Sequence, residues 1–220
     1  MRAKDPHDGG VLYLLGGAYF QQKQPENARQ ALGELLTSVA SPAQAQFLIG
    51  KACYEGGRFE QALEAFRATL ELDPAFPGAH LELGKTHISA RNNEQARLEL
   101  ALALHENAED ASAHYYLGSL LLQDERLAEA VPHLQEARRL NPDFWGPEYY
   151  LGKAMLPMSQ PKDAIGLLER AAYLNAEEPS IYYQLARALK MQGRDAESKA
   201  ALEQVKRLNA GKLARIQLEK

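Results

Sequence analysis

The stretch HLELGKTHISARNNEQARLEL, residues 80–100, decides the fold of this chain. It holds two runs with the helical spacing of apolar residues, separated by the turn-forming segment Arg91-Asn92-Asn93. Gly84 lies in the first run, and Ala96 and Leu100 lie in the second. A residue without a side chain lets two helix backbones approach closely, so the stretch predicts a pair of antiparallel helices that meet at Gly84.

The same arrangement recurs every 34 residues along the chain. The small residue is found at Gly16, Gly50, Gly84, Gly118, Gly152 and Ala186. Twelve residues later comes Ala28, Ala62, Ala96, Ala130, Ala164 or Ser198. Sixteen residues later comes Leu32, Phe66, Leu100, Leu134, Leu168 or Leu202. Equal intervals without an insertion predict an array of six helical hairpins whose core is formed by these columns.

These residues resemble the tetratricopeptide repeat family, in which Leu-Gly, Ala, a bulky apolar residue and often Pro recur with this period. The resemblance covers about residues 9–212. It implies an all-α fold, a right-handed superhelical solenoid of antiparallel helical hairpins. The six repeats are then 9–42, 43–76, 77–110, 111–144, 145–178 and 179–212. We expect residues 1–8 to be the remnant of a preceding repeat or a linker, and residues 213–220 to form a C-terminal capping helix.

Two prolines depart from the repeat pattern. Pro132 falls inside a second helix and Pro157 falls at the end of a first helix. Proline removes a backbone donor and clashes with the preceding turn, so we expect local bending or shortening at both places. The fifth repeat is therefore expected to be the least regular.

Composition excludes several classes of function. The formal net charge of −4 gives no general attraction to phosphate backbones or anionic lipid, so we expect no nucleic-acid partner. No run of about 18 apolar residues is present, which predicts no membrane insertion and a soluble chain, cytoplasmic or periplasmic. The single cysteine, Cys53, rules out an intrachain disulfide.

The resemblance implies that a partner binds along the concave wall formed by the first helix of each repeat. Residues three before, one after and four after the small residue share one helical face, and we expect them to line this groove. The predicted ligand-binding residues are Tyr13, Phe47, Lys51, Tyr54, Leu81, Lys85, Tyr115, Tyr149, Lys153, Tyr183 and Arg187. This aromatic and basic set suits a protein or peptide that carries apolar and acidic residues.

No catalytic or metal-binding constellation is assembled in the sequence. Asp110 and Ser112 precede His114 at a helix start, where they are expected to cap free amides. His80, His87 and His114 are expected to pack between helices, and Cys53 falls in a core column. We therefore predict no catalytic residues, no metal and no cofactor, and hence no enzyme.

The leading hypothesis is a protein–protein interaction scaffold. The alternative is a substrate-recruiting or regulatory arm of a larger enzyme or assembly. RNA binding by a related helical array would need a basic surface, which the acidic composition disfavours. Self-association through an open N-terminal end, where Val11, Leu12 and Leu14 would lack a cover, is a further hypothesis.

Overall fold

The second helices of the hairpins begin at the same point of the 34-residue period in the computed structural model, which describes residues 8–218. They are α2 (Pro25–Ser38), α4 (Phe59–Leu72), α6 (Asn93–Glu106), α8 (Leu127–Leu140), α10 (Pro161–Leu174) and α12 (Asp195–Leu218). The first helices are α1 (Gly9–Gln21), α3 (Pro42–Glu55), α5 (Ala79–Ser89), α7 (Ala111–Gln123), α9 (Trp145–Met155) and α11 (Pro179–Met191). Residues 8–218 contain no strand, so the predicted all-α solenoid of antiparallel helical hairpins is confirmed.

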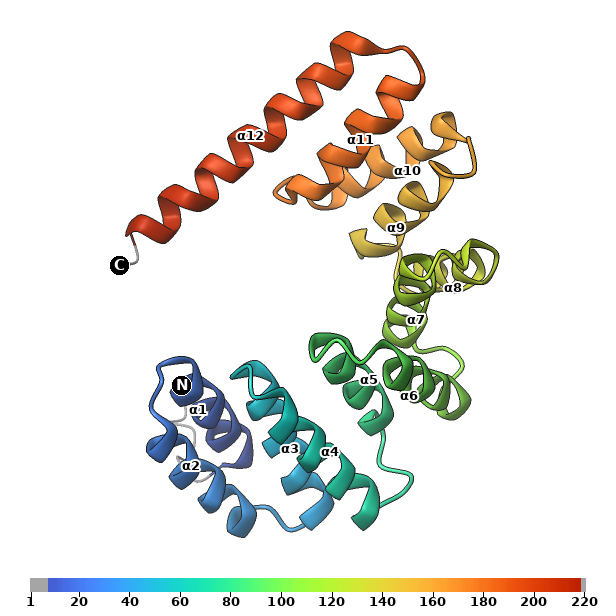
Figure 1. Cartoon of the computed structure of the whole chain (residues 1–220). Helices are drawn as coiled ribbons and strands as arrows, with labels where there is room; N and C mark the ends of the chain where they lie inside the picture. The colour runs from blue at the N-terminus through green and yellow to red at the C-terminus, as the bar shows by residue number, and fades with distance from the viewer. Residues whose placement is uncertain (1–7, 219–220) are drawn as a thin grey trace. The chain divides into compact units, whose positions relative to one another are not determined.

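The chain divides into two compact units, residues 1–108 and 109–220. The first unit contains α1–α6 and the second contains α7–α12, three hairpins each (Figure 1). Within a unit, each first helix packs against its own second helix and against the first helix of the next hairpin. Each second helix also contacts the first helix that follows it in the same unit.

The two helices of a hairpin meet where the sequence predicts. A methyl group added at Gly16, Gly50, Gly84, Gly118 or Gly152 would lie 2.6–2.8 Å from the side chain sixteen residues later. Those five partner side chains are buried. Carbon atoms cannot approach so closely, so any larger residue would force the helices apart. In the sixth hairpin the small residue is Ala186, and its counterpart Leu202 is 39% exposed.

A residue in the left-handed backbone conformation, with a positive φ, ends the turn between the two helices of every hairpin. These residues are Lys23, Gly57, Arg91, Glu125, Ser159 and Gly193, with φ between 56° and 74°. The next amide donates a hydrogen bond to the carbonyl oxygen five residues earlier, as from Asn92 to His87 at 2.8 Å. This is the Schellman bond that satisfies the last carbonyls of a helix. Glycine is favoured at this position, yet four of the six residues have side chains.

The two prolines differ in their effect. Helix α9 ends at Met155, two residues earlier in the period than α7, which ends at Gln123. The shortening expected at Pro157 is therefore confirmed. Helix α8 keeps the same 14 residues as α4 although Pro132 lies within it, so Pro132 does not shorten the helix, and local bending there stays a prediction. Pro132 is exposed and lies in the second turn of α8, where it removes one backbone hydrogen bond near the start of the helix.

Helix α12 is longer than the other second helices. It continues without interruption through Lys212 to Leu218, so residues 213–218 are its last turns. Residues 1–7 and 219–220, parts of the expected N-terminal remnant and capping helix, lie outside the described residues. The division of the chain into domains at the boundaries given above stays a prediction.

We expect Gly118→Ala to lower the free energy of unfolding by about 1–2 kcal/mol, because the added methyl meets Leu134 at 2.8 Å and the Ala130 carbonyl oxygen at 3.2 Å. The matched control is Gly166→Ala, in the interior of α10, where a Cβ has no atom within 4 Å. That change should stabilise the chain by about 0.5–1 kcal/mol through helix propensity. Urea unfolding followed by circular dichroism measures both, and equal effects would contradict the close-approach interpretation.

Two polar residues occupy one core column three residues after the small residue. Cys53 is 4% exposed, and burial raises the pKa of its thiol to about 11, so the thiol is neutral near pH 7. His87 is 3% exposed and its Nδ1 atom has no hydrogen-bond partner. Burial, and next the Arg67 guanidinium, lower the pKa of His87 below its ordinary value, while Glu99 and Glu60 oppose the shift weakly. His87 is therefore buried in its neutral form.

The unfolded chain binds a proton at His87 more readily than the folded chain does, because the pKa is lowered in the folded state. The free energy of unfolding is therefore higher above the unfolded pKa of about 6.5 and falls as the pH drops through that value. We expect His87→Leu, the residue found at Leu121 and Leu189 in the same column, to stabilise the chain by about 1 kcal/mol at pH 7.5 and by more at pH 5.5. The control His105→Gln changes an exposed histidine and should leave the pH dependence unaltered. The free energy of unfolding of both variants is measured with denaturant at the two pH values. A stabilisation by His87→Leu that is the same at pH 5.5 and 7.5 would contradict the burial of His87 in its neutral form.

Candidate functional site: the first-helix face

The first-helix face is the set of residues three before, one after and four after the small residue on each first helix. In the first unit the structure brings members of adjacent helices together. The Lys51 Nζ atom lies 5.4 Å from the ring centroid of Tyr13, and the Lys85 Nζ atom lies 5.5 Å from that of Tyr54. Each lysine thus lies over a tyrosine of the preceding first helix, an attractive cation–π arrangement.

Acidic residues that the sequence analysis missed reduce the basic character of this face. Lys85 donates to both carboxylate oxygens of Glu82 at 2.8 Å. Burial, and next the Glu55 carboxylate, raise the pKa of Tyr13. Glu82 lies two residues before Gly84 and so lies beside the predicted columns. The first-unit face is consequently aromatic with partly compensated charge.

Phe47 faces the core more than the predicted groove. Its ring lies 5.6 Å from that of Phe66 and 5.0 Å from that of Phe76, measured between centroids. It is one of the half-buried side chains packed against the core cluster of the first unit, and Leu81 is also half-buried. Phe76 comes from the segment between α4 and α5 and is not part of a helix. Phe47 therefore stabilises the junction between hairpins.

In the second unit Tyr115 and Tyr149 belong to an aromatic cluster between α7 and α9. Its members are Tyr115, Tyr116, Phe144, Trp145, Tyr149 and Tyr150. The Tyr115 ring lies 4.8 Å from that of Phe144 and 5.7 Å from that of Tyr150. All six are half-buried, and burial raises the pKa of Tyr115. Lys153 lies over Tyr150, with its Nζ atom 5.8 Å from the ring centroid.

The predicted residues of α11 are exposed at a hollow. Tyr183 and Arg187 line a cavity of about 640 Å³ between α11 and α12. Ala186, Met191 and Leu202 contribute apolar lining. The remaining lining residues are Lys190, Asp195, Ser198 and Lys199. The Lys190 Nζ atom lies 2.7 Å from an Asp195 carboxylate oxygen, and Arg187 donates to the side-chain oxygen of Gln184 at 2.9 Å.

The polar residues considered for chemistry have structural roles. Asp110 accepts hydrogen bonds from the Ser112 and Ala113 amides at 2.8 and 2.9 Å, so the predicted capping is confirmed. No group of three His, Cys, Asp or Glu side chains within residues 8–218 is placed to hold a metal ion.

Two histidines pair between the helices of their own hairpins. His80 Nδ1 lies 2.7 Å from a Glu99 carboxylate oxygen, and His114 Nδ1 lies 2.9 Å from His133 Nδ1. Their predicted packing between helices is confirmed.

No described helix is both long and apolar enough to cross a membrane.

The three apolar residues named for self-association differ in exposure. Leu14 is 51% exposed and Val11 is half-buried. The expectation that Leu12 lacks a cover is wrong, because its side chain is buried in the core cluster that includes Leu32 and Leu35. Self-association itself stays a prediction.

Several solved structures share this fold. MamA 41-end from Desulfovibrio magneticus RS-1 matches with a TM-score of 0.68 and 20% identity, over 77% of this chain and 96% of that chain. YrrB, a TPR protein with an unusual peptide-binding site, matches with a TM-score of 0.65 and 16% identity, over 86% of this chain and 97% of that chain. The APC/C hetero-tetramer Cut9-Hcn1 matches with a TM-score of 0.77 and 17% identity, over 93% of this chain and 41% of that chain. At these identities the likeness shows the fold alone.

No curated protein matches the sequence of this chain. Models of the tetratricopeptide repeat match residues 13–80, 54–120, 111–144 and 179–212. Together these ranges cover more than half of the chain and include parts of both units. With the 34-residue period and the hairpins described above, they show that the chain belongs to the tetratricopeptide repeat family.

Proposed function

We propose that the chain is a protein-interaction scaffold that binds a peptide or partner protein on its first-helix face, foremost at the hollow between α11 and α12. Tetratricopeptide repeats are associated with protein interaction rather than catalysis, so we propose no enzymatic activity. The observation that carries the proposal is the exposure of Tyr183 and Arg187 beside an apolar hollow. Elsewhere on the face the aromatic residues are half-buried between hairpins.

The chemistry of the hollow favours a partner with apolar and acidic residues. Met191 and Leu202 offer apolar contact area, and Tyr183 adds a rigid ring with a polar tip. Arg187 and Lys199 supply positive charge that is not held by a carboxylate among residues 8–218. Opposite charge on the partner would speed association and fix its orientation.

The second candidate is an interaction arm within a larger enzyme or assembly. The match to Cut9-Hcn1 favours it, because that likeness spans 93% of this chain but 41% of the other chain. A repeat array of this size therefore occurs as part of a longer protein in a multi-subunit structure. The same binding surface would serve in both cases.

We expect the double variant Tyr183→Ala/Arg187→Glu to lose partner binding at least about tenfold, because truncation of an aromatic anchor together with charge reversal removes about 1.4 kcal/mol or more. Proteins captured from a lysate of the source organism by the wild-type chain and by the variant are compared by quantitative mass spectrometry.

The matched control is Tyr173→Ala/Arg170→Glu on α10. This variant also changes an arginine and an exposed tyrosine on one helix, and the Arg170 guanidinium lies 5.2 Å from the Tyr173 ring centroid. Partners lost by the α11 variant and kept by the control support the proposal. Equal capture by the wild type and the α11 variant would place binding elsewhere.

A further inference from the structure

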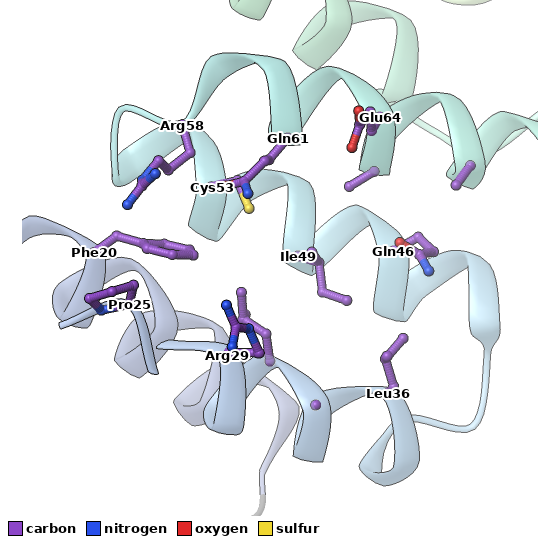
Figure 2. Close-up of a pocket in the computed structure, with 14 residues that line it drawn as sticks. Phe20, Pro25, Arg29, Leu36, Gln46, Ile49, Cys53, Arg58, Gln61 and Glu64 are labelled. Atoms are coloured by element: carbon purple, nitrogen blue, oxygen red, sulfur yellow. The ribbon is translucent and has the colours of Figure 1, made fainter. Parts of the chain in front are cut away.

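A cleft of about 570 Å³ lies in the first two hairpins, between the second helices α2 and α4, and residues of α3 also line it (Figure 2). Figure 2 shows Phe20 and Arg58 at one end, Gln46 and Leu36 at the other, and Arg29 and Ile49 between them. Of these residues only Phe20, four after Gly16, belongs to the first-helix face. The cleft therefore concerns a second surface, built mainly by α2, α3 and α4 and separate from the α11–α12 hollow, which lies in the other unit.

The second hairpin carries a small residue in the cleft where the third, fourth and fifth hairpins carry long ones. Ala65 occupies the column that holds Glu99, His133 and Leu167 in the third, fourth and fifth hairpins. In two of these hairpins the side chain pairs with a histidine of the first helix, His80 or His114. Gly33, on the facing helix α2, has no atom within 4 Å of an added Cβ. Space that side-chain pairs fill elsewhere in the array is open here.

The cleft has an uncharged floor and the Arg58 cation at one end, while the Glu64 carboxylate lines it away from Arg58. Ile49 and Leu32 lie in its lining, and the neutral thiol of Cys53 adds no charge. The Arg58 guanidinium carbon lies 5.3 Å from the ring centroid of Phe20, and no carboxylate of residues 8–218 forms an ion pair with it. A guanidinium held on an aromatic ring and free of a counter-charge is prepared to bind a carboxylate.

Arg29 adds positive charge close to the same end. Its guanidinium lies 2.8 Å from Glu26, but both side chains are 76% exposed. An exposed pair of this kind contributes little energy and is readily exchanged for another carboxylate. Two arginines therefore face an anionic group that enters beside Phe20.

The length of the cleft suits a segment of extended peptide. Its lining runs along α2 from Pro25 to Leu36, a separation of eleven residue steps, which spans about 16 Å at the helical rise. An extended chain of about five residues has this length. The amides of Gln46 and Gln61 line the cleft and can exchange hydrogen bonds with a peptide backbone.

We propose that this cleft docks a short extended segment of a partner protein, with an apolar side chain in the middle of the cleft and a carboxylate against Arg58. The segment lies between α2 and α4. Alternate residues of an extended segment point the same way, so the carboxylate belongs two positions from the apolar residue.

The test uses three fluorescein-labelled pools of seven-residue peptides, each with one Leu, Ile or Phe at the centre. Two positions away the pools carry Asp or Glu, Lys, or Gln. Fluorescence anisotropy with the wild-type chain should show the acidic pool binding at least about tenfold more tightly than the lysine pool. Arg58→Glu should reverse this preference, a result that mere unfolding would not produce. Equal binding of the three pools would overturn the proposal.

Variants that fill the cleft test whether the peptides bind in it. Ala65→Leu and Gly33→Gln introduce the residues found in the same columns at Leu167 and Gln135 and should abolish preference for the acidic pool. The control Ala101→Gln introduces the same residue in the same column, at an exposed position of the third hairpin, and should preserve the preference for the acidic pool. Retained binding by both filling variants would overturn the proposal. Competition by decanoate with no binding of any peptide would also overturn it, in favour of a free aliphatic acid.

The first-helix face is tested separately in the same assay. The variant Tyr183→Ala/Arg187→Glu should bind the acidic pool as the wild type does, because both residues lie in the other unit. Loss of binding in this variant alone would show that the peptides use the α11–α12 hollow, and the cleft proposal would fail while the proposed function stood.

Discussion

The close approach of two helices at a residue without a side chain is the constraint on which this structure depends. At Gly84 the Leu100 side chain occupies the volume that a Cβ would need. Backbones this close fix the register of one helix against the other, because a shift by one residue would bring a larger side chain to the crossing point. Once that register is set, the 34-residue period determines which columns face the core and which face outward.

The surfaces proposed for binding arise where the repeat departs from its own pattern. Ala65 stands where Glu99 makes an interhelical pair in the next hairpin, and an open cleft results. Leu202 is the exposed member of an otherwise buried column, and it lines the hollow beside Tyr183. Repetition provides stability through packing, whereas the deviations leave apolar surface next to uncompensated charge. Both surfaces therefore follow from local losses of packing volume on a regular framework.

The sequence predicted the hairpins, their turns, the Asp110 cap and the burial of Cys53, because each depends on short-range spacing that recurs with the period. It did not predict how accessible the groove residues are. Phe47 and Tyr115 pack against Phe76 and Phe144, which occupy the same position of the 34-residue period between hairpins, and the spacing does not show how far they cover the groove residues. The cleft was missed for a different reason. It depends on several small residues from three helices acting together, and no single residue among them carries a signal of function.

Site-specific photo-crosslinking would test the central claim, that partners bind the first-helix face, most directly. A benzoylphenylalanine in place of Tyr183, 51% exposed on α11, is compared with one in place of Tyr173, 79% exposed on α10. Irradiation with the captured partner should yield a covalent adduct from position 183 and none from position 173, although the latter is the more exposed. An adduct from position 173 alone would contradict the account.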